Sequence, residues 1–365
     1  MTEYSLIVLA AGGTGGHIFP AEALARELLG RGLKVALMTD KRGCRFGDDL
    51  PVPTHRVCAS SLGRSLVGKA FSIARMGTGV LQAILLLRKL RPTAVVGFGG
   101  YPSIPTLFAA ARMGIPIILH DQNAVLGQAN LAMMNKARIV ATSFSHIVGI
   151  KPGPRAKVVL TGNPVRPAFV TQRATPYKAP TDDGAIRLLV MGGSLGAHVF
   201  SEVVPAALGL LPESLRRRIV LTQQCRAEDL ARAKTAFAGL GIEAELSPFF
   251  RDVPERMAAA HLVIGRAGGS TVAELTVVGR PAIFVPFPHG HAGEQTANAE
   301  ALAEAGGAWL IPQQAFTPEA LAVRLETLFA MPTTLAKSAA AARALGKITA
   351  ADSLADCVME AMSHR

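Results

Sequence analysis

The chain has 365 residues, half of them apolar and 18% charged, which is the composition of a globular protein and excludes a disordered one. A chain of this length exceeds one ordinary hydrophobic core, so we expect two domains. The formal net charge is +12, and all of the excess lies in residues 1–165, which hold 19 Lys and Arg against 7 Asp and Glu. A basic half indicates an anionic partner, which is a nucleic acid, an anionic membrane or a phosphorylated substrate, unless the charge serves solubility alone.

Residue counts argue against several classes of protein. One Trp and three Tyr are too few for a platform that stacks single-stranded nucleic acid, so no nucleic-acid partner is expected. The four Cys have neither metal nor redox spacing and are typical of reduced thiols in a cytoplasmic protein. Glu3 stands where a signal peptide has its basic leader, and no run approaches the roughly 18 apolar residues of a membrane span. The chain is expected to lie on a membrane at most.

In chain order, short apolar runs alternate with helical periodicity. The first series of expected strands is Leu6–Ala11, Lys34–Thr39, Ala94–Gly97, Ile115–Leu119, Ile139–Ala141 and Val158–Thr161. Pro20–Leu29 and Thr78–Lys89 between them have the period of helices. Strand, helix, strand at this rhythm predicts a parallel sheet with helices on both faces.

The pattern restarts after Thr175–Gly184, whose prolines, aspartates and glycine indicate a linker. The second series is Arg187–Met191, Ile219–Thr222, Ala244–Leu246, Leu262–Ile264, Ala282–Val285 and Ala308–Ile311. We therefore expect two doubly wound α/β domains in tandem. Because ligands bind at the carboxyl ends of the strands in such sheets, the expected site is a cleft between the domains.

Four Gly-rich segments follow strand-like runs. They are Ala11–Pro20, Gly97–Pro102, Gly192–Ala197 and Arg266–Thr271. Glycine lets the backbone approach a phosphate, and a helix N-terminus supplies N–H groups and partial positive charge. An NAD-dependent dehydrogenase competes for the first segment, with Asp40 as its ribose-binding acid. However, Ile18 stands where the dinucleotide-binding fingerprint needs a third glycine. A dehydrogenase would also leave the other three Gly-rich segments unexplained.

A specific combination of motifs runs through the chain, although each motif alone is unspecific. The motifs are Gly12–Pro20, Gly99–Tyr101, His120–Asn123, Gly162–Arg166, Gly192–Ser194 and Gln295–Ala299. In this order the set resembles glycosyltransferase family 28, in particular the bacterial peptidoglycan enzymes of that family. Those enzymes transfer N-acetylglucosamine from UDP-N-acetylglucosamine to the C4 hydroxyl of the muramoyl sugar of lipid I, giving lipid II and UDP.

The resemblance implies a fold of the GT-B type, α/β with two Rossmann-like doubly wound parallel-sheet domains facing a central cleft. Residues 1–164 would form the acceptor and membrane-docking domain, residues 165–345 the UDP-N-acetylglucosamine-binding domain, and a C-terminal helix in 346–365 would pack back on the first. It further implies an inverting hexosyltransferase without metal or other cofactor, peripheral on the cytoplasmic face of the bacterial inner membrane. The alternatives are a GT-B enzyme with another lipid acceptor, the dehydrogenase, and a catalytically silent nucleotide-sugar binder.

His17 is the expected general base on the acceptor hydroxyl, because a helix N-terminus disfavours imidazolium and keeps the ring neutral. A purely structural, helix-capping His is the alternative. Thr14, Gly15 and Gly16 resemble the family's donor-contacting turn, although by spacing alone they could equally bind the acceptor diphosphate. The expected acceptor residues are Gly99, Gly100, Tyr101 and Asn130.

The resemblance assigns the remaining donor contacts. These residues are Asn123, Arg166, Ser194, Phe250, Gly269, Ser270, Thr271, Val272, Ala273, Glu274 and Gln295. Glu274 would accept both ribose hydroxyls, unless it is a solvated helix charge. The chain departs from the family pattern at Asp121, where Glu is frequent, at Leu195, where Gln is frequent, and at Glu294. No Asp-x-Asp pair stands near a strand end, so leaving-group charge would be offset by N–H groups and Arg without metal.

Leu62–Pro92 is expected to be a membrane-docking face, since it carries six basic residues and no acid. The basic residues are Arg64, Lys69, Arg75, Arg88, Lys89 and Arg91. Interleaved with them are Leu66, Val67, Phe71, Ile73, Val80, Leu81 and Ile84–Leu87. An apolar patch rimmed by basic residues suits an anionic lipid surface. Ordinary helix packing is the alternative, and part of Ile84–Leu87 must belong to the core.

Overall fold

The computed structural model describes residues 5–41, 52–60, 66–150, 156–193 and 196–363, with the backbone alone for 66–71, 73 and 291. Two compact units are present. The first comprises Met1–Arg166 and Lys347–Arg365, and the second comprises Pro167–Gly346. The division falls two residues after the expected domain boundary, and the C-terminal helix belongs to the first unit.

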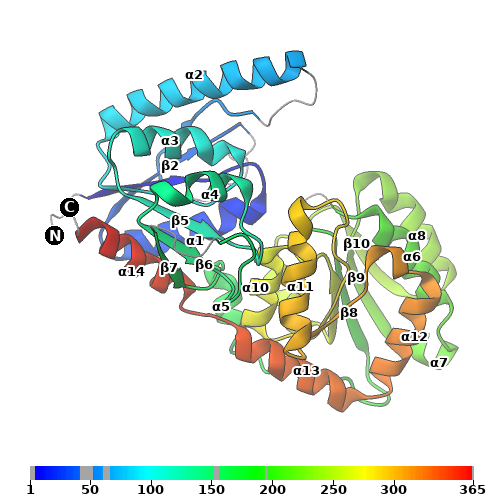
Figure 1. The fold of residues 1–365 in the computed structure, drawn as a ribbon. Coiled ribbons are helices and arrows are strands. Elements are labelled where there is room, and N and C mark those ends of the chain that lie inside the picture. Colours follow the sequence, from blue (N-terminus) through cyan, green and yellow to red (C-terminus); the bar gives the residue numbers. More distant parts are fainter. Residues whose placement is uncertain (1–4, 42–51, 61–65, 151–155, 194–195, 364–365) are drawn as a thin grey trace. The chain divides into compact units, whose positions relative to one another are not determined.

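The first unit is built on a seven-stranded sheet with the order β3-β2-β1-β4-β5-β6-β7, in which every pairing is parallel (Figure 1). Its strands are β1 (Leu6–Ala10), β2 (Lys34–Thr39), β3 (Thr54–Arg56), β4 (Ala94–Gly97), β5 (Ile117–Asp121), β6 (Ile139–Thr142) and β7 (Lys157–Leu160). The central strands β4 and β5 are buried along their whole length. Burial on both faces explains why they are continuous apolar runs without alternation.

Helices cover both faces of this sheet. They are α1 (Gly15–Gly30), α2 (Leu66–Leu90), the 3₁₀ helix Tyr101–Ser103, α3 (Ile104–Arg112), α4 (Gln128–Met133), the 3₁₀ helix Met134–Lys136 and α14 (Ala350–Ser363). Leu24 of α1 and Leu354 of α14 share one core cluster with β1, whereas Leu87 of α2 and Leu107 of α3 belong to the cluster on the opposite face. No helix among the described residues is long and apolar enough to cross a membrane.

The second unit is built on a six-stranded parallel sheet with the order β10-β9-β8-β11-β12-β13. Its strands are β8 (Ile186–Met191), β9 (Ile219–Gln224), β10 (Glu243–Ser247), β11 (Leu262–Gly265), β12 (Ala282–Phe284) and β13 (Ala308–Leu310). Its helices are α5 (Pro167–Gln172), α6 (His198–Gly209), α7 (Glu213–Arg216), α8 (Leu230–Gly239), α9 (Val253–Ala259), α10 (Gly269–Val278), α11 (Glu294–Glu304), α12 (Pro318–Phe329) and α13 (Pro332–Leu345), with 3₁₀ turns at Ala227–Asp229, His291–Gly293 and Gln313–Ala315. Helices α6, α8 and α12 pack on one face, and α10 and α11 lie on the other (Figure 1).

Each sheet has one point at which the strand order reverses. In the first sheet β1 lies between β2 and β4, and in the second β8 lies between β9 and β11. At such a point, the loops that follow two neighbouring strands lead to opposite faces of the sheet. The crevice between these loops is the usual ligand site. All four Gly-rich segments follow these strands: β1 and β4 in the first unit, and β8 and β11 in the second.

Three expectations from the sequence were wrong in detail. Helix α1 begins at Gly15, not Pro20, because the Thr14 carbonyl already accepts the backbone N–H groups of His17 and Ile18. Helix α2 begins at Leu66, far before Thr78. Thr175–Gly184 does not connect the units: the Tyr177 side chain packs on the second core, and its hydroxyl donates to the carbonyl of His261 at 2.9 Å.

Candidate functional site

His17 lies in the first turn of α1, directly after the first Gly-rich segment. The backbone N–H of His17 donates to the Thr14 carbonyl at 3.1 Å, and the Thr14 hydroxyl oxygen lies 3.1 Å from Nδ1 of the ring. Gly15 and Gly16 form the helix start, and the first turn holds no acidic residue. The positive end of the helix is therefore not neutralised by a side chain of that turn.

His17 is half-buried, and the protein around its ring controls its charge. Desolvation lowers the pKa of its imidazole to about 4, because the surrounding protein disfavours the charged form. The ring is therefore neutral at pH 7 and has a nitrogen lone pair that can accept a proton. This state agrees with the general-base role expected from the sequence.

The second Gly-rich segment lies against the imidazole of His17. Gly99 and Gly100 have φ values of +81° and +69°, which side chains other than glycine rarely adopt. A Cβ on Gly100 would lie 3.4 Å from Nε2 of His17, and one on Gly99 would lie 3.7 Å from it. The two glycines thus bring the backbone of this segment close to Nε2. The half-buried Tyr101 begins the 3₁₀ turn that follows.

The end of β5 places further expected residues beside this segment. Asn130 is 1% exposed, and its Nδ2 would lie 3.4 Å from a Cβ on Gly99. Asn123 is half-buried in the loop after β5, and its backbone N–H donates to Asp121 at 3.1 Å. The first unit therefore brings His17, Gly99, Gly100 and Asn130 together.

Arg166 lies near the start of α1. Its guanidinium is 4.4 Å from the centroid of the Phe19 ring, a cation–π contact, and a Cβ on Gly15 would lie 2.8 Å from that same ring. The expected donor residues Gly15 and Arg166 therefore occupy one region of the first unit. Asp40, the acid of the dehydrogenase alternative, is 7% exposed and closely approaches Gly12.

In the second unit, the third Gly-rich segment turns tightly after β8. A Cβ on Gly192 would lie 2.4 Å from the backbone nitrogen of Ala197, so no larger residue fits. The Gly192 N–H donates to the side chain of Gln224 at 3.1 Å, which ties the turn to the end of β9. The expected phosphate contact Ser194, and the departure at Leu195, lie outside the described residues.

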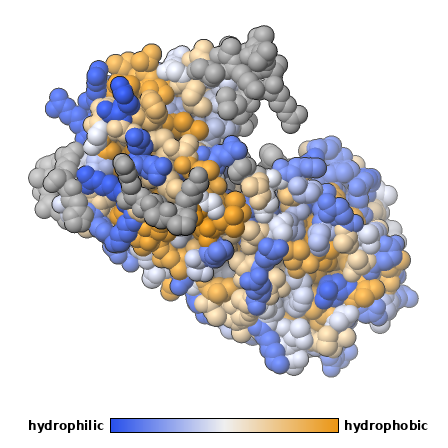
Figure 2. Space-filling model, in the orientation of Figure 1, coloured by the Kyte–Doolittle hydropathy of each residue, from blue (hydrophilic) through white to orange (hydrophobic). Residues whose placement is uncertain are grey.

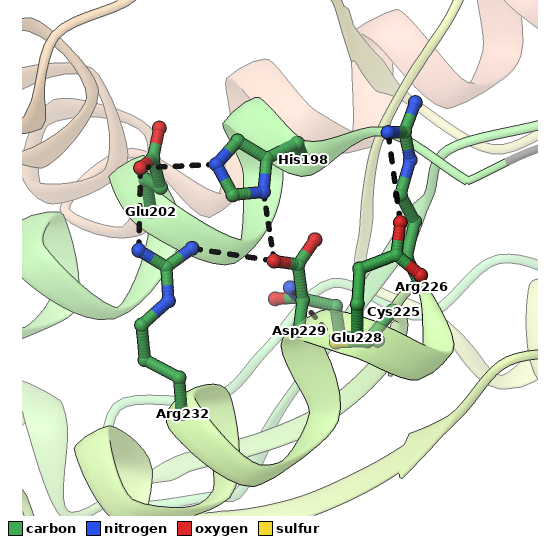
Figure 3. A network of polar contacts seen from close by, with 8 residues as sticks. His198, Glu202, Cys225, Arg226, Glu228, Asp229 and Arg232 are labelled. Atoms are coloured by element: carbon green, nitrogen blue, oxygen red, sulfur yellow. Dashed lines mark hydrogen bonds and ion pairs between the residues drawn. The ribbon is translucent and has the colours of Figure 1, made fainter.

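A polar network adjoins this segment where α6 begins (Figure 3). The Nδ1 atom of His198 lies 2.7 Å from the Asp229 carboxylate, and its Nε2 lies 3.2 Å from Glu202. Arg232 contacts both carboxylates, at 3.2 Å to Glu202 and 3.4 Å to Asp229. The network joins α6 to α8, and Arg226 beside it has its Cγ 3.0 Å from a Cβ on Gly196.

The fourth Gly-rich segment begins α10. Gly268 is the N-cap of this helix, and the expected residues Gly269 to Ala273 form its first turns, again without an acid in the first turn. Glu274 follows on the same helix and is 9% exposed, so its carboxylate is not a solvated helix charge. A buried carboxylate at this position fits the expected role of accepting two ribose hydroxyls.

Two more expected residues lie in the second unit, Phe250 on the loop after β10 and Gln295 on α11. Phe250 is buried, with the Arg256 guanidinium 4.3 Å from its ring centroid. Gln295, near the start of α11, accepts the Phe287 N–H at 3.0 Å through its side-chain oxygen. Neighbouring Glu294 is half-buried, and its Oε1 would lie 2.7 Å from a Cβ on Gly290. The Glu294 carboxylate, at which the chain departs from the family pattern, therefore lies close to Gly290 in the loop before α11.

Sequence reasoning missed the side chains that hold these loops in place. Arg266 is 9% exposed and donates to the carbonyls of Val285 and Pro286 and to Gln313, at 2.9, 3.1 and 2.7 Å. Asn298 is fully buried and donates to the Ala267 carbonyl at 2.9 Å. The available signal was a charged residue directly after an apolar strand. Among the described residues, no group of three or more His, Cys, Asp or Glu side chains is placed to hold a metal ion.

Comparison with known proteins agrees with this arrangement. Residues 7–142 match the N-terminal domain of glycosyltransferase family 28, and residues 187–356 match its C-terminal domain. A Rhodospirillum centenum protein named UDP-N-acetylglucosamine--N-acetylmuramyl-(pentapeptide) pyrophosphoryl-undecaprenol N-acetylglucosamine transferase is 56% identical over 97% of this chain and 94% of its own length. The protein of the same name from Paramagnetospirillum magneticum is 52% identical over 98% of this chain and 97% of its own length.

A solved structure supports the same assignment. The crystal structure of Acinetobacter baumannii MurG is 28% identical, has a TM-score of 0.78 and covers 98% of this chain and 99% of that one. Together with the two parallel sheets, this likeness confirms the expected α/β fold of the GT-B type with two Rossmann-like domains. The two domain matches span more than half of the sequence, and the relatives span nearly all of it, so this chain belongs to glycosyltransferase family 28.

Proposed function

We propose that this protein transfers N-acetylglucosamine from UDP-N-acetylglucosamine to the C4 hydroxyl of the muramoyl sugar of lipid I, giving lipid II and UDP in peptidoglycan synthesis. The observation that carries the proposal is the enzyme name shared by two relatives that are similar over nearly the whole chain. Under this proposal the protein is an inverting hexosyltransferase. Membership in a glycosyltransferase family also displaces the dehydrogenase alternative, which relied on Asp40 and one Gly-rich segment.

His17 is the residue best suited to activate the acceptor. Its neutral imidazole takes the proton of the C4 hydroxyl while that oxygen attacks the anomeric carbon of N-acetylglucosamine. The bond from the anomeric carbon to the UDP oxygen breaks in the same displacement, which inverts the anomeric centre. The proton ends on Nε2, the nitrogen beside Gly99 and Gly100. This geometry supports acceptor binding along the second Gly-rich segment, with Tyr101 and Asn130 as further contacts.

Negative charge grows on the UDP oxygen as the bond breaks. Two helix N-termini without acids, those of α1 and α10, are suited to offset such charge through their backbone N–H groups. In the second unit, Gly269 to Ala273 would bind the diphosphate with Ser194, and Arg166 of the first unit would add a fixed positive charge. On this basis we propose that the reaction needs no metal or other cofactor.

The second unit offers further groups for the rest of the donor. Glu274 would accept the two ribose hydroxyls, and the backbone of Phe250 would read uracil. Gln295 would form hydrogen bonds with hydroxyls of the donor sugar. The Phe287 N–H, which donates to the Gln295 side-chain oxygen, orients that side chain. From the first unit, the turn Thr14 to Gly16 and Asn123 would contribute donor contacts.

Helix α2 supports docking to the cytoplasmic face of the bacterial inner membrane as a peripheral protein. Leu81 and Leu85 are 65% and 66% exposed on this helix, whereas Leu87 is buried in the core. Exposed Arg75, Arg88, Lys89 and Arg91 accompany them. Figure 2 shows hydrophobic and hydrophilic surface side by side over this part of the first unit. An apolar patch among basic residues suits an anionic bilayer, with each basic residue worth about 1 kcal/mol.

Two further helices of the first unit also carry exposed apolar side chains: Phe108 of α3 is 48% exposed and Leu131 of α4 is 43% exposed. Ile84 and Leu86 pack against the core as partly buried residues, so Ile84–Leu87 divides between core and surface. Other expected members of the docking face have no described side chains: Arg64, Leu66, Val67, Lys69, Phe71 and Ile73.

The decisive test is transfer of radiolabelled N-acetylglucosamine from UDP-N-acetylglucosamine to a short-chain lipid I analogue, with and without EDTA. We expect labelled disaccharide product to form at equal rates with and without EDTA. Calorimetric binding of UDP-N-acetylglucosamine without any product would leave the donor assignment standing and reject this acceptor. Product that disappears with EDTA and returns with a divalent cation would reject the metal-free chemistry alone.

A further inference from the structure

The Asp121 carboxylate sits at the carboxyl end of β5 and is 2% exposed. Its Oδ1 accepts the backbone N–H of Asn123 at 3.1 Å, and its Oδ2 accepts the backbone N–H of Gly127 at 2.8 Å. The Oδ2 atom also accepts Nδ2 of Asn130 at 3.0 Å. A buried carboxylate is tolerated when several N–H groups bond to it, and bonds to a charged acceptor are stronger than neutral ones.

These bonds hold both ends of the loop that joins β5 to α4. Asn123 lies at the beginning of the loop, and Gly127 is the N-cap of α4, with φ of −65° and ψ of 148°. Asn130 lies on α4 itself. One side chain thus fixes the loop and the first turn of the following helix relative to the end of the strand.

The orientation of the Asn130 amide follows from the same contacts. Its Nδ2 donates both to Asp121 and to the carbonyl of His120, at 3.0 Å each, so the amide cannot flip without losing two bonds. The Nδ2 atom also approaches Gly99, and the backbone of Gly99 approaches the ring of His17. Asp121 contacts Asn130, and a Cβ on Gly99 would lie 3.4 Å from Nδ2 of Asn130 and 3.6 Å from the ring of His17, so the four residues are near neighbours.

The oxygen of this amide has no hydrogen-bond partner in the part of the chain that the structure describes. Oδ1 of Asn130 is buried and accepts no hydrogen bond from the described residues. A buried acceptor without a bond costs free energy, which a hydroxyl or amide N–H of a bound ligand would recover. With its Nδ2 fixed by Asp121, the amide holds this oxygen in one direction.

We propose that Asp121 is a positioning residue for the acceptor, which acts by fixing the loop Asn123–Gly127 and the amide of Asn130 beside His17. The inference rests on the proposed function, because it assigns this side of the first unit to the acceptor sugar. Asp121 itself touches no reacting atom. Its removal therefore weakens acceptor binding and alignment, and it affects the affinity for UDP-N-acetylglucosamine less, because only the contact with Asn123 leads to a donor residue.

The test compares Asp121→Asn, Asp121→Glu and wild type in the transfer assay, with acceptor and donor varied separately. Asparagine keeps the size of the side chain but loses the charge and directs an NH₂ group at N–H donors. We expect kcat/KM for the acceptor to fall roughly ten- to hundredfold, the range for lost hydrogen bonds to a charged group. The donor affinity, measured by calorimetry, should fall by a smaller factor than the acceptor kcat/KM, because Asp121 reaches the donor only through Asn123. Asp121→Glu keeps the charge and both oxygens and should recover part of the loss.

Arg138→Met is the matched control. It removes the bond from Arg138 to the Ala361 carbonyl, at 2.8 Å, before the opposite end of β6 in the same unit. An equal loss of Tm with unchanged acceptor KM would show that destabilisation alone does not produce the effect. An acceptor kcat/KM in Asp121→Asn within about twofold of wild type, a change too small for one lost hydrogen bond, would overturn the inference, as would the same acceptor defect in Arg138→Met.

A second variant covers the case in which Asp121→Asn does not fold. Asn130→Asp places a second carboxylate against Asp121 and removes the Nδ2 donor, so the same acceptor-specific loss is expected. A wild-type acceptor kcat/KM in this variant would overturn the inference. Absence of transfer by the wild-type protein would instead reject the proposed function, and the inference with it.

Discussion

The hydroxyl oxygen of Thr14 lies 3.1 Å from Nδ1 of His17, and the direction of this hydrogen bond decides which imidazole nitrogen can take a proton. A neutral imidazole has one N–H donor and one acceptor nitrogen. When Nδ1 carries the hydrogen and donates it to Thr14, the lone pair is on Nε2, which lies beside Gly99 and Gly100. The reverse tautomer would direct an N–H at the acceptor hydroxyl and could not act as its base.

We therefore expect His17→Ala to lower kcat about 10²- to 10⁴-fold, the usual contribution of a general base. Thr14→Val, which keeps the shape and loses the hydroxyl, should lower kcat about tenfold, as expected for loss of one hydrogen bond. Thr14→Ser keeps the hydroxyl and should retain most of the activity. Steady-state kinetics on a soluble lipid I analogue measures all three. Turnover that survives His17→Ala would remove His17 as the base.

The rate should depend on pH through the lowered pKa of His17. A base works only when deprotonated, and burial lowers the pKa of this imidazole to about 4. The acceptor kcat/KM should therefore be flat from neutral pH downward and decline only as pH approaches 4. A decline centred near 6.5, the ordinary histidine pKa, would contradict a base whose pKa is lowered to about 4.

Stability should also respond to pH, through His17 and His120 together. Burial lowers the pKa of both to about 4, whereas unfolded histidines titrate near 6.5. Between these values the unfolded chain binds more protons than the folded one, so acid favours unfolding. The free energy of unfolding should thus be fully present above pH 6.5 and fall as pH drops from 6.5 toward 4. Denaturant titrations of wild type and His17→Gln measure this slope, which should be smaller in the variant.

The fold could be predicted from the sequence because each Gly-rich segment follows an apolar run too short for a helix. The local pattern placed β1, β4, β8 and β11, and parallel sheets force their carboxyl ends to one edge. Helix starts were harder. Pro20 suggested the beginning of α1, but it lies inside the helix, whose first turn depends on Thr14 and two glycines.

Contacts between distant residues could not be predicted from one sequence. Thr175–Gly184 has the composition of a linker, yet Arg218 donates to the Gly184 carbonyl at 3.0 Å and holds this segment on the second unit. The charge of Arg266 was visible, but its burial depends on residues 19 to 47 positions away. Likewise, Asp121 was noticed as a departure from a family pattern, whereas its bonds to Gly127 and Asn130 needed the fold.

Arg266 should matter for the donor through the loop after β12. It donates to the carbonyls of Val285 and Pro286, and the next residue, Phe287, donates its N–H to Gln295. Lysine cannot reproduce this forked arrangement. We expect Arg266→Lys to lower the free energy of unfolding by about 1.5–3 kcal/mol and to raise the KM for UDP-N-acetylglucosamine, with the acceptor KM unchanged.

Arg280 provides the control for that prediction. It is also buried, at 1% exposure, and donates to the carbonyls of Ala258 and Val278 before the start of β12, at the opposite end of the sheet. Arg280→Lys should cost similar stability without changing either KM. If both variants raise the donor KM equally at matched Tm, the loop contact of Arg266 has no separate role.

Membrane docking should depend on Leu81 and Leu85. Replacing both with Glu removes exposed apolar surface from α2 and adds charge that an anionic bilayer repels. We expect the double variant to lose cosedimentation with vesicles containing anionic lipid, while transfer to a water-soluble acceptor analogue stays at the wild-type rate. Val323→Glu is the matched control, because Val323 is equally exposed, at 65%, on α12 of the second unit. Equal loss of vesicle binding in this control would show that net charge, and not the surface of α2, governs docking; unchanged binding in the double variant would reject α2 as the docking face.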